Sequence, residues 1–124
     1  MKKIRMTKGQ LESRISDAVA KFEKEYMEDD YKDIKTKIFQ DHILIIIDGF
    51  LNVPERRLVD LEHGEVLFKE IRTALFEVSQ QQLRECIQEI VDVRIVSSHW
   101  DVSTKTGEKI IVLTVDCNLE EYLT

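Results

Sequence analysis

The run from His42 to Gly49, HILIIIDG, constrains the fold more than any other stretch of this sequence. An unbroken series of Ile and Leu of this length predicts a strand, and such a strand is usually buried on both faces. A sheet built around it therefore needs cover on each side. If helices cover one face, a second copy of the chain is the simplest cover for the other, so we expect a homodimer.

Two hairpins are predicted. Ile34 to Phe39 is expected to pair with the Ile- and Leu-rich strand. Gln40-Asp41-His42 lies between them, and we interpret it as a tight turn rather than as an Asp41–His42 acid–base pair. Near the C-terminus, residues 93–102 alternate between apolar and polar side chains, residues 103–107 form a Ser, Thr, Lys and Gly turn, and residues 109–117 return as a strand.

Helical periodicity dominates the N-terminal part of the chain. Thr7 is a plausible N-cap for a helix from Lys8 to about Glu28, whose apolar residues are Leu11, Ile15, Val19, Phe22 and Tyr26. Acidic residues crowd its end: Glu23, Glu25, Glu28, Asp29 and Asp30. A cluster of this kind could hold a hard cation, but it lacks the ligand spacing of a calcium loop. We favour a solvated acidic connector, at which the helix frays.

A second helical region occupies the middle. Pro54 lies in the first turn of a short helix, with Leu58 and Leu61 facing inward, and Glu62-His63-Gly64 breaks it. A longer helix follows, with Leu67, Ile71, Leu75 and Val78 on one stripe. The S-x-x-Q string at residues 79–82 predicts a kink or restart, after which Leu83, Cys86, Ile87 and Ile90 continue an apolar face.

The element order is therefore α-β-β-α-α-β-β. It predicts an α+β fold in which a four-stranded, mainly antiparallel sheet has helices packed on one face. With 124 residues, 43% of them hydrophobic, residues 1–124 form a single domain with one core. We expect a flexible basic tail at residues 1–7 and a flexible acidic tail at residues 118–124.

Composition narrows the function and the compartment. A net charge of −6 argues against nucleic-acid binding, which relies on clustered Lys and Arg. Cys86 and Cys117 lack a CxxC or framework spacing, which favours free thiols in a reducing compartment. No apolar run reaches about 18 residues and no signal peptide begins the chain. We therefore expect a cytoplasmic protein that reaches a membrane only by docking.

Catalysis and metal binding find little support. Ser97, His99 and Asp101 share one strand face, but successive side chains there lie roughly 7 Å apart, too far for a nucleophilic triad. As metal ligands, His99 and Asp101 would need His42 or His63, and the three His show no spacing signature. We expect no catalytic residues, no metal, no cofactor and no enzymatic activity.

The turn STKTGEK offers hydroxyl groups and a Lys to an anion, but it lacks a GxxxxGK[ST] loop and a helix N-terminus. We favour a plain hairpin loop. The alternative function is a small-ligand or anion-sensing domain. Its candidate binding residues are His99, Asp101, Ser103, Lys105, Thr106, Gly107 and Glu108.

Three strings carry a resemblance to a known family. They are KGQLESRISDAVAKFEKEY, LNVPERRLVDLEHGEVLFKEIRTALFE and VRIVSSHWDVSTKTGEKIIVLTVDCNLE, which together span roughly Lys8 to Glu120. The chain resembles the MpsC family, bacterial proteins long described as a domain of unknown function. The last string is the most specific: His99, Asp101, Ser103, Thr106, Gly107 and Glu108 fall where the family pattern has them.

This resemblance implies a soluble accessory component of a sodium-translocating, membrane-potential-generating system whose integral membrane partners carry the ion. It transfers no catalytic residue. Where relatives tend to have a Pro between the central helices, this chain has Ser79-Gln80-Gln81, which puts the sharpness of that bend in doubt.

Overall fold

The computed structural model describes residues 3–124 of the chain, and residues 1–2 lie outside the described residues. Within that part the elements are, in order, α1 (Lys8–Phe22), the π-helical turn η1 (Glu23–Met27), β1 (Asp33–Phe39), β2 (His42–Asp48), α2 (Val53–Val59), α3 (Gly64–Gln88), β3 (Ile95–Ser103), β4 (Glu108–Val115) and α4 (Leu119–Tyr122).

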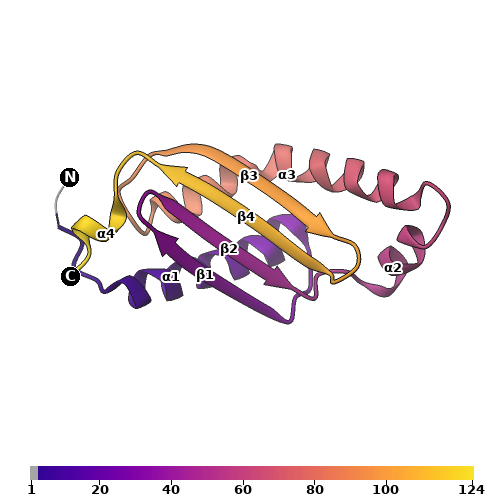
Figure 1. Cartoon of the computed structure of the whole chain (residues 1–124), viewed down its shortest axis with the longest axis horizontal. Coiled ribbons are helices and arrows are strands. Elements are labelled where there is room, and N and C mark those ends of the chain that lie inside the picture. Colours follow the sequence, from indigo (N-terminus) through magenta and orange to yellow (C-terminus); the bar gives the residue numbers. More distant parts are fainter. Residues whose placement is uncertain (1–2) are drawn as a thin grey trace.

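The strands form one antiparallel sheet in the order β1-β2-β4-β3. β1 pairs with β2, and β3 pairs with β4, as the two predicted hairpins require. β2 also pairs with β4, so these two strands lie at the centre of the sheet. Figure 1 shows α1 and α3 together behind the sheet, while its front carries no helix. The predicted α+β fold, with a four-stranded antiparallel sheet and helices on one face, is confirmed.

The core lies between the sheet and these helices. Alternate residues of the two central strands are buried there: Ile43, Ile45, Ile47, Ile111, Leu113 and Val115. The whole apolar stripe of α1 is also buried except Tyr26, which follows it in η1 and is exposed. Burying each of these side chains contributes about 1.5–3 kcal/mol, so the helix-facing side of the sheet supplies most of the hydrophobic stabilisation.

Helix α1 also covers the β1 edge of the sheet. Its N-terminus has the predicted Thr7 cap, completed by Gln10 in a capping box. Farther along, the Glu12 carboxylate accepts a hydrogen bond from the backbone N–H of Ile38 at 2.8 Å. This bond satisfies one outward N–H of the edge strand, which makes pairing with another chain less favourable at that position.

The junction between α2 and α3 depends on two backbone positions. Pro54 lies in the first turn of α2, as predicted, and His63 adopts the left-handed conformation (φ 61°) that turns the chain. Gly64 is buried against the carbonyl of Leu58, so that an added Cβ would overlap this oxygen. The prediction that Leu61 faces inward is wrong, because α2 ends at Val59 and leaves Leu61 in the exposed turn.

Helix α3 runs without a break, so the kink or restart predicted at residues 79–82 is wrong. An S-x-x-Q string caps a helix only where the backbone leaves helical geometry, and one continuous buried stripe holds this region in the helix. That stripe consists of Gly64, Phe68, Arg72, Phe76, Leu83 and Ile87. Phe76 stacks on Trp100 of β3, with 5.3 Å between the ring centroids.

Strand β3 contains a β-bulge between Ile95 and Ser97 that the sequence pattern did not indicate. The extra residue shifts the alternation by one position. Ile95 is consequently buried on the helix side, where Val102 and the partly buried Trp100 also lie, whereas Val96 is exposed. Ser97 and His99 keep their predicted common face.

The two ends of the chain meet. Ile4 forms a parallel bridge with Leu123, and its N–H donates to the carbonyl of Tyr122 at 2.6 Å. Ile4 and Leu123 both border the core. Residues 3–7 and 118–124 thus contact each other, and the flexibility expected of both tails stays a prediction, part of which falls on residues 1–2.

Candidate functional site

The predicted ligand-binding residues lie along the second half of β3, in the β3–β4 turn and at the start of β4. Only some of them come together. Asp101, Ser103 and Glu108 line a shallow depression of about 110 Å³. His99 lies further back along β3 and is exposed, and Lys105 and Thr106 extend into solvent from the turn.

Most polar groups of this turn hold the turn itself. The Ser103 hydroxyl accepts from the N–H of Thr106, and the Thr106 hydroxyl accepts from the N–H of Glu108. Gly107 has φ +73°, and its carbonyl accepts from the N–H groups of Gly49 and Phe50. The resulting structure is a hairpin loop that anchors the segment after β2. With two carboxylates beside it, this loop does not favour an anion, and the sensor function stays a prediction.

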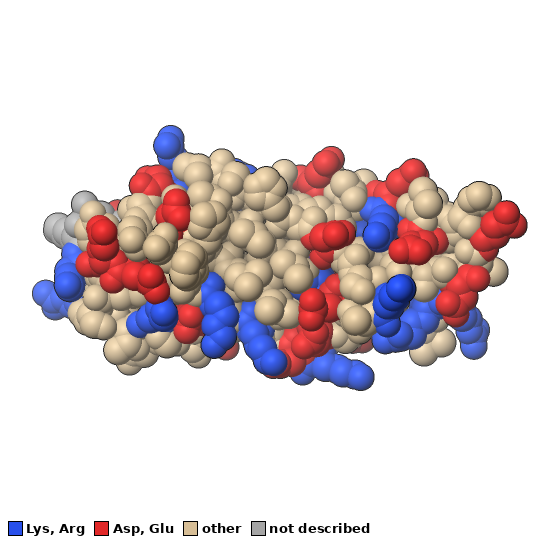
Figure 2. All heavy atoms as spheres, in the orientation of Figure 1, with Lys and Arg blue, Asp and Glu red and all other residues tan. Residues whose placement is uncertain are grey.

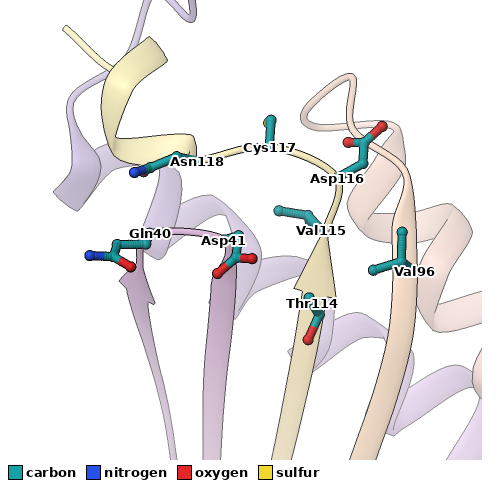
Figure 3. A pocket seen from close by; sticks show the side chains of 8 residues that line it. All are labelled: Gln40, Asp41, Val96, Thr114, Val115, Asp116, Cys117 and Asn118. Atoms are coloured by element: carbon teal, nitrogen blue, oxygen red, sulfur yellow. The ribbon is translucent and has the colours of Figure 1, made fainter.

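A larger depression of about 420 Å³ lies at the opposite end of the sheet. It is lined by Gln40, Asp41, Val96, Thr114, Val115, Asp116, Cys117 and Asn118. Figure 3 shows these side chains distributed over the β1–β2 turn, β3 and the end of β4, with Cys117 pointing away from the sheet. Burial raises the pKa of the Cys117 thiol, which favours the unreactive protonated form. The depression thus presents no activated nucleophile.

The strongest polar cluster is buried between the helices and β4. Arg72 of α3 donates two hydrogen bonds to Asp29, at 2.8 and 2.9 Å, and one to Glu55 of α2 at 2.6 Å. Lys109 of β4 contacts both carboxylate oxygens of Glu23, at 2.7 and 2.9 Å. A 3.5 Å contact between Lys109 and Asp29 joins the two halves. We call these five residues the ion cluster.

Aromatic rings enclose the cations of the ion cluster. Arg72 lies over the rings of Phe50 and Phe68, and Lys109 also lies over Phe50, with 5.5 Å to the centroid. Each cation is thus attracted by a ring face in addition to its carboxylate partners. The ion cluster links η1, α2, α3 and β4, so its role is to hold these elements together.

Charge balance explains the shifted pKa values in the ion cluster. Three carboxylates face two cations, so full ionisation leaves one surplus negative charge. Burial raises the pKa of Glu23, the charge of Asp29 adds to the rise, and Lys109 opposes it. Burial alone would lower the pKa of Arg72, but its bonds to Asp29 and the pull of Glu55 raise it.

The ion cluster was not predicted, although the sequence contains a signal for it. The expectation of a solvated connector is wrong for Glu23 and Asp29, which are both buried. Glu23 lies four residues after the buried Val19, on the same face of the helix. Arg72 lies four residues from both Phe68 and Phe76, and Lys109 is in phase with the buried residues of β4. Charged residues in phase with buried apolar ones are expected to be paired.

An exposed apolar ridge runs along α3 beside its buried stripe. The predicted stripe of Leu67, Ile71, Leu75 and Val78 forms this surface, which we call the α3 ridge. These residues are 41–74% exposed. Beside the ridge lies a depression of about 290 Å³ lined mainly by apolar side chains, including Leu58 and Phe68. An apolar ridge of this length beside a recess is typical of a protein-binding surface.

The front of the sheet is a second uncovered surface. Leu44 and Ile46 of β2 and Ile110 and Val112 of β4 are only half-buried there. The expectation that both faces of β2 are buried is therefore met on the helix side alone. Figure 2 shows this front, with a largely uncharged area over its middle and Lys and Arg side chains interspersed with Asp and Glu along the β1 edge.

Among residues 3–124, no three His, Cys, Asp or Glu side chains are grouped so that they could hold a metal ion. In the same part of the chain, no helix combines the length and apolar composition needed to cross a membrane.

Fold and surfaces together define a small α+β domain whose main exposed features are two apolar surfaces. Comparison with known proteins identifies the family of this domain. The model of the family described as "Na+-translocating membrane potential-generating system (MpsC)" matches residues 7–117, and the chain belongs to the MpsC family. The uncharacterized protein YbcI of Bacillus subtilis (strain 168) is 30% identical over 120 residues, 97% of each chain. No solved structure matches.

Proposed function

We propose that this chain is a non-enzymatic accessory protein of a sodium-translocating, membrane-potential-generating system. We further propose that it acts as a homodimer at the cytoplasmic side of the membrane and binds an integral membrane partner through the α3 ridge. The family description supports the system, and the exposed ridge is the observation that supports docking.

Charge favours a protein partner over the lipid surface. Exposed Glu70 and Glu77 flank the α3 ridge, and the chain has a net charge of −6. The cytoplasmic leaflet is negatively charged and would repel such a surface. Cytoplasmic loops of membrane proteins carry an excess of Lys and Arg, which complements the acidic flanks. We therefore expect apolar contacts along the ridge, surrounded by pairs between these acids and basic loop residues.

No reaction centre is assembled among residues 3–124, which supports the non-enzymatic part of the proposal. Ser97, His99 and Asp101 follow one another along an edge strand, at a spacing that prevents direct hydrogen bonds between their side chains. Glu23, whose pKa is raised by burial, is fully buried and pairs with Lys109, so it is not accessible to a substrate.

Capture from native membranes tests the proposal. Affinity-tagged protein is incubated with membranes of the source organism solubilised in mild detergent, and the retained proteins are identified. Wild type should retain an integral membrane protein. Val78→Glu, a change at a side chain that is 74% exposed, should reduce that recovery at least about tenfold by placing a charge within an apolar contact.

Val53→Glu is the matched control, because Val53 is also largely exposed but lies at the start of α2, outside both the α3 ridge and the front of the sheet. It should leave recovery unchanged. Equal recovery with both variants would exclude the α3 ridge, and failure of wild type to retain any integral membrane protein would contradict the accessory function.

The sensor alternative is tested separately by thermal shift with bicarbonate, nucleotides and divalent metals. A stabilising ligand whose effect is lost in His99→Ala would support it.

A further inference from the structure

The strand register arranges the front of the sheet in transverse rows. Lys35 pairs with Ile46, Ile46 with Ile110, and Ile110 with Asp101, so these residues form one row across the sheet. The next row is formed by Lys37, Leu44, Val112 and His99. Each of these two rows has a Lys on the β1 edge, two apolar residues in the middle and a polar residue on β3. The row nearest the β3–β4 turn is instead acidic and consists of Asp33, Asp48, Glu108 and Ser103.

The first of these rows is complementary to itself when it is reversed, because its Lys then faces its Asp. We propose that the front of the sheet binds a second copy of this chain, face to face, about a twofold axis parallel to the strands between β2 and β4. Lys35 of each copy then lies opposite Asp101 of the other, and the apolar residues of both copies meet in the middle. This deepens the proposed function, because it assigns the homodimer a surface and a symmetry.

Charge selects this axis over the other twofold arrangement of two facing sheets. An axis perpendicular to the strands would place β1 of one copy against β1 of the other, bringing Lys35 and Lys37 of both copies together. Like charges facing each other oppose association. The axis parallel to the strands does place Asp48 of each copy opposite Glu108 of the other, but its two Lys35–Asp101 pairs offset that repulsion, and the perpendicular axis offers no such opposite-charge pair among its Lys, Asp and Glu. Two facing sheets usually keep their strands within about 30° of each other, and a Lys side chain is long enough to span that offset.

The size of the face indicates a modest affinity. Four strands spaced about 4.8 Å apart and seven residues long at about 3.4 Å per residue cover roughly 450 Å² per copy. Two copies bury about 900 Å² in outline, near the lower limit of specific interfaces. We therefore expect a reversible dimer with a dissociation constant in the micromolar range.

Sedimentation velocity on the whole chain, from about 1 to 200 μM, tests this arrangement by charge reversal. Lys35→Glu and Asp101→Lys should each weaken dimerisation about tenfold, because symmetry repeats the repulsive pair twice in each dimer. The double variant should restore association to within about threefold of wild type. Both positions are exposed, so circular dichroism should show native folding for every variant.

Three results would overturn the inference: a wild type that stays monomeric throughout the range, a Lys35→Glu variant that dimerises more tightly, or a double variant that is not restored. Val78→Glu is the control and should stay dimeric while losing the membrane partner. A monomeric wild type that still captures an integral membrane protein would reject this dimer alone. A charge-sensitive dimer that captures none would reject the accessory function alone.

Discussion

Replacement of Arg72 by Met should destabilise the protein more than most single substitutions. The Arg72 side chain is only 6% exposed and holds two buried or half-buried carboxylates, Asp29 and Glu55. Met retains most of the side-chain volume between Phe50 and Phe68 but removes all three hydrogen bonds. Loss of one partner from a buried ion pair costs about 3–5 kcal/mol, because the remaining charge stays buried without compensation.

The expected loss of stability is large relative to the total free energy of unfolding. Domains of this size are stable by about 5–15 kcal/mol, so a loss of about 4 kcal/mol removes a quarter or more of the total. Urea unfolding followed by circular dichroism and by the fluorescence of Trp100 measures it directly. Each kcal/mol lowers Tm by roughly 3 °C in a domain of this length, so Tm should fall by about 10 °C or more.

Two further variants isolate the buried charge from other effects. Lys69→Met changes a half-exposed cation on the same helix, whose contact with Glu65 at 3.8 Å is a surface pair. It should cost less than about 0.5 kcal/mol. Adding Asp29→Asn to Arg72→Met removes the orphaned charge and should recover part of the loss. An Arg72→Met variant within about 1 kcal/mol of wild type would refute the assignment of a buried, paired charge.

Three other changes should have distinct signatures. Gly64→Ala should cost at least about 2 kcal/mol, because the added Cβ would overlap the Leu58 carbonyl. Phe76→Ala should cost about 3 kcal/mol in urea unfolding and shift Trp100 emission to longer wavelength, because it removes the stacked ring. Burial raises the pKa of Glu23, so wild-type stability relative to Glu23→Gln should be highest below pH 4.5 and fall as pH rises through the raised pKa.

Contrary results would be equally informative. An unchanged Tm in Gly64→Ala would mean that the α2–α3 turn can move aside. Unshifted Trp100 emission in Phe76→Ala would mean that other groups shield the indole. For Glu23, the sign follows from proton binding: above pH 4.5 the folded state holds a proton that the unfolded state has lost, so unfolding becomes easier as pH rises. A stability difference that is flat, or that grows with pH, would contradict the raised pKa.

Local features were predictable because local chemistry determines them. The Ile run from 43 to 47 and the alternation of residues 109–115 predicted both central strands within one or two residues. Thr7 and Pro54 correctly indicated where α1 and α2 begin, since cap preferences depend on the first turn alone. The antiparallel sheet followed from two hairpins separated by helices.

Features set by contacts distant in sequence were not predictable in the same way. Glu23 and Lys109 are 86 residues apart, and nothing near Glu23 shows that β4 brings a cation to it. The bulge at Val96 likewise reverses which residue of β3 is buried without a Gly or Pro to mark it. Leu67 and Ile71 read as an ordinary apolar stripe, and only the packed structure shows that Phe68 and Phe76 occupy the inner face instead.

The two uncovered surfaces lie on different sides of the molecule, which makes the two proposals separable. Ile43, Ile45 and Ile47 are fully buried by α1 and α3, whereas Leu44 and Ile46 are half-covered only by neighbouring side chains. A second copy completes their burial from the front. The α3 ridge belongs to a helix behind the sheet (Figure 1), so a dimer formed through the front leaves both ridges available to partners. Residues of one surface can therefore be changed without altering the other.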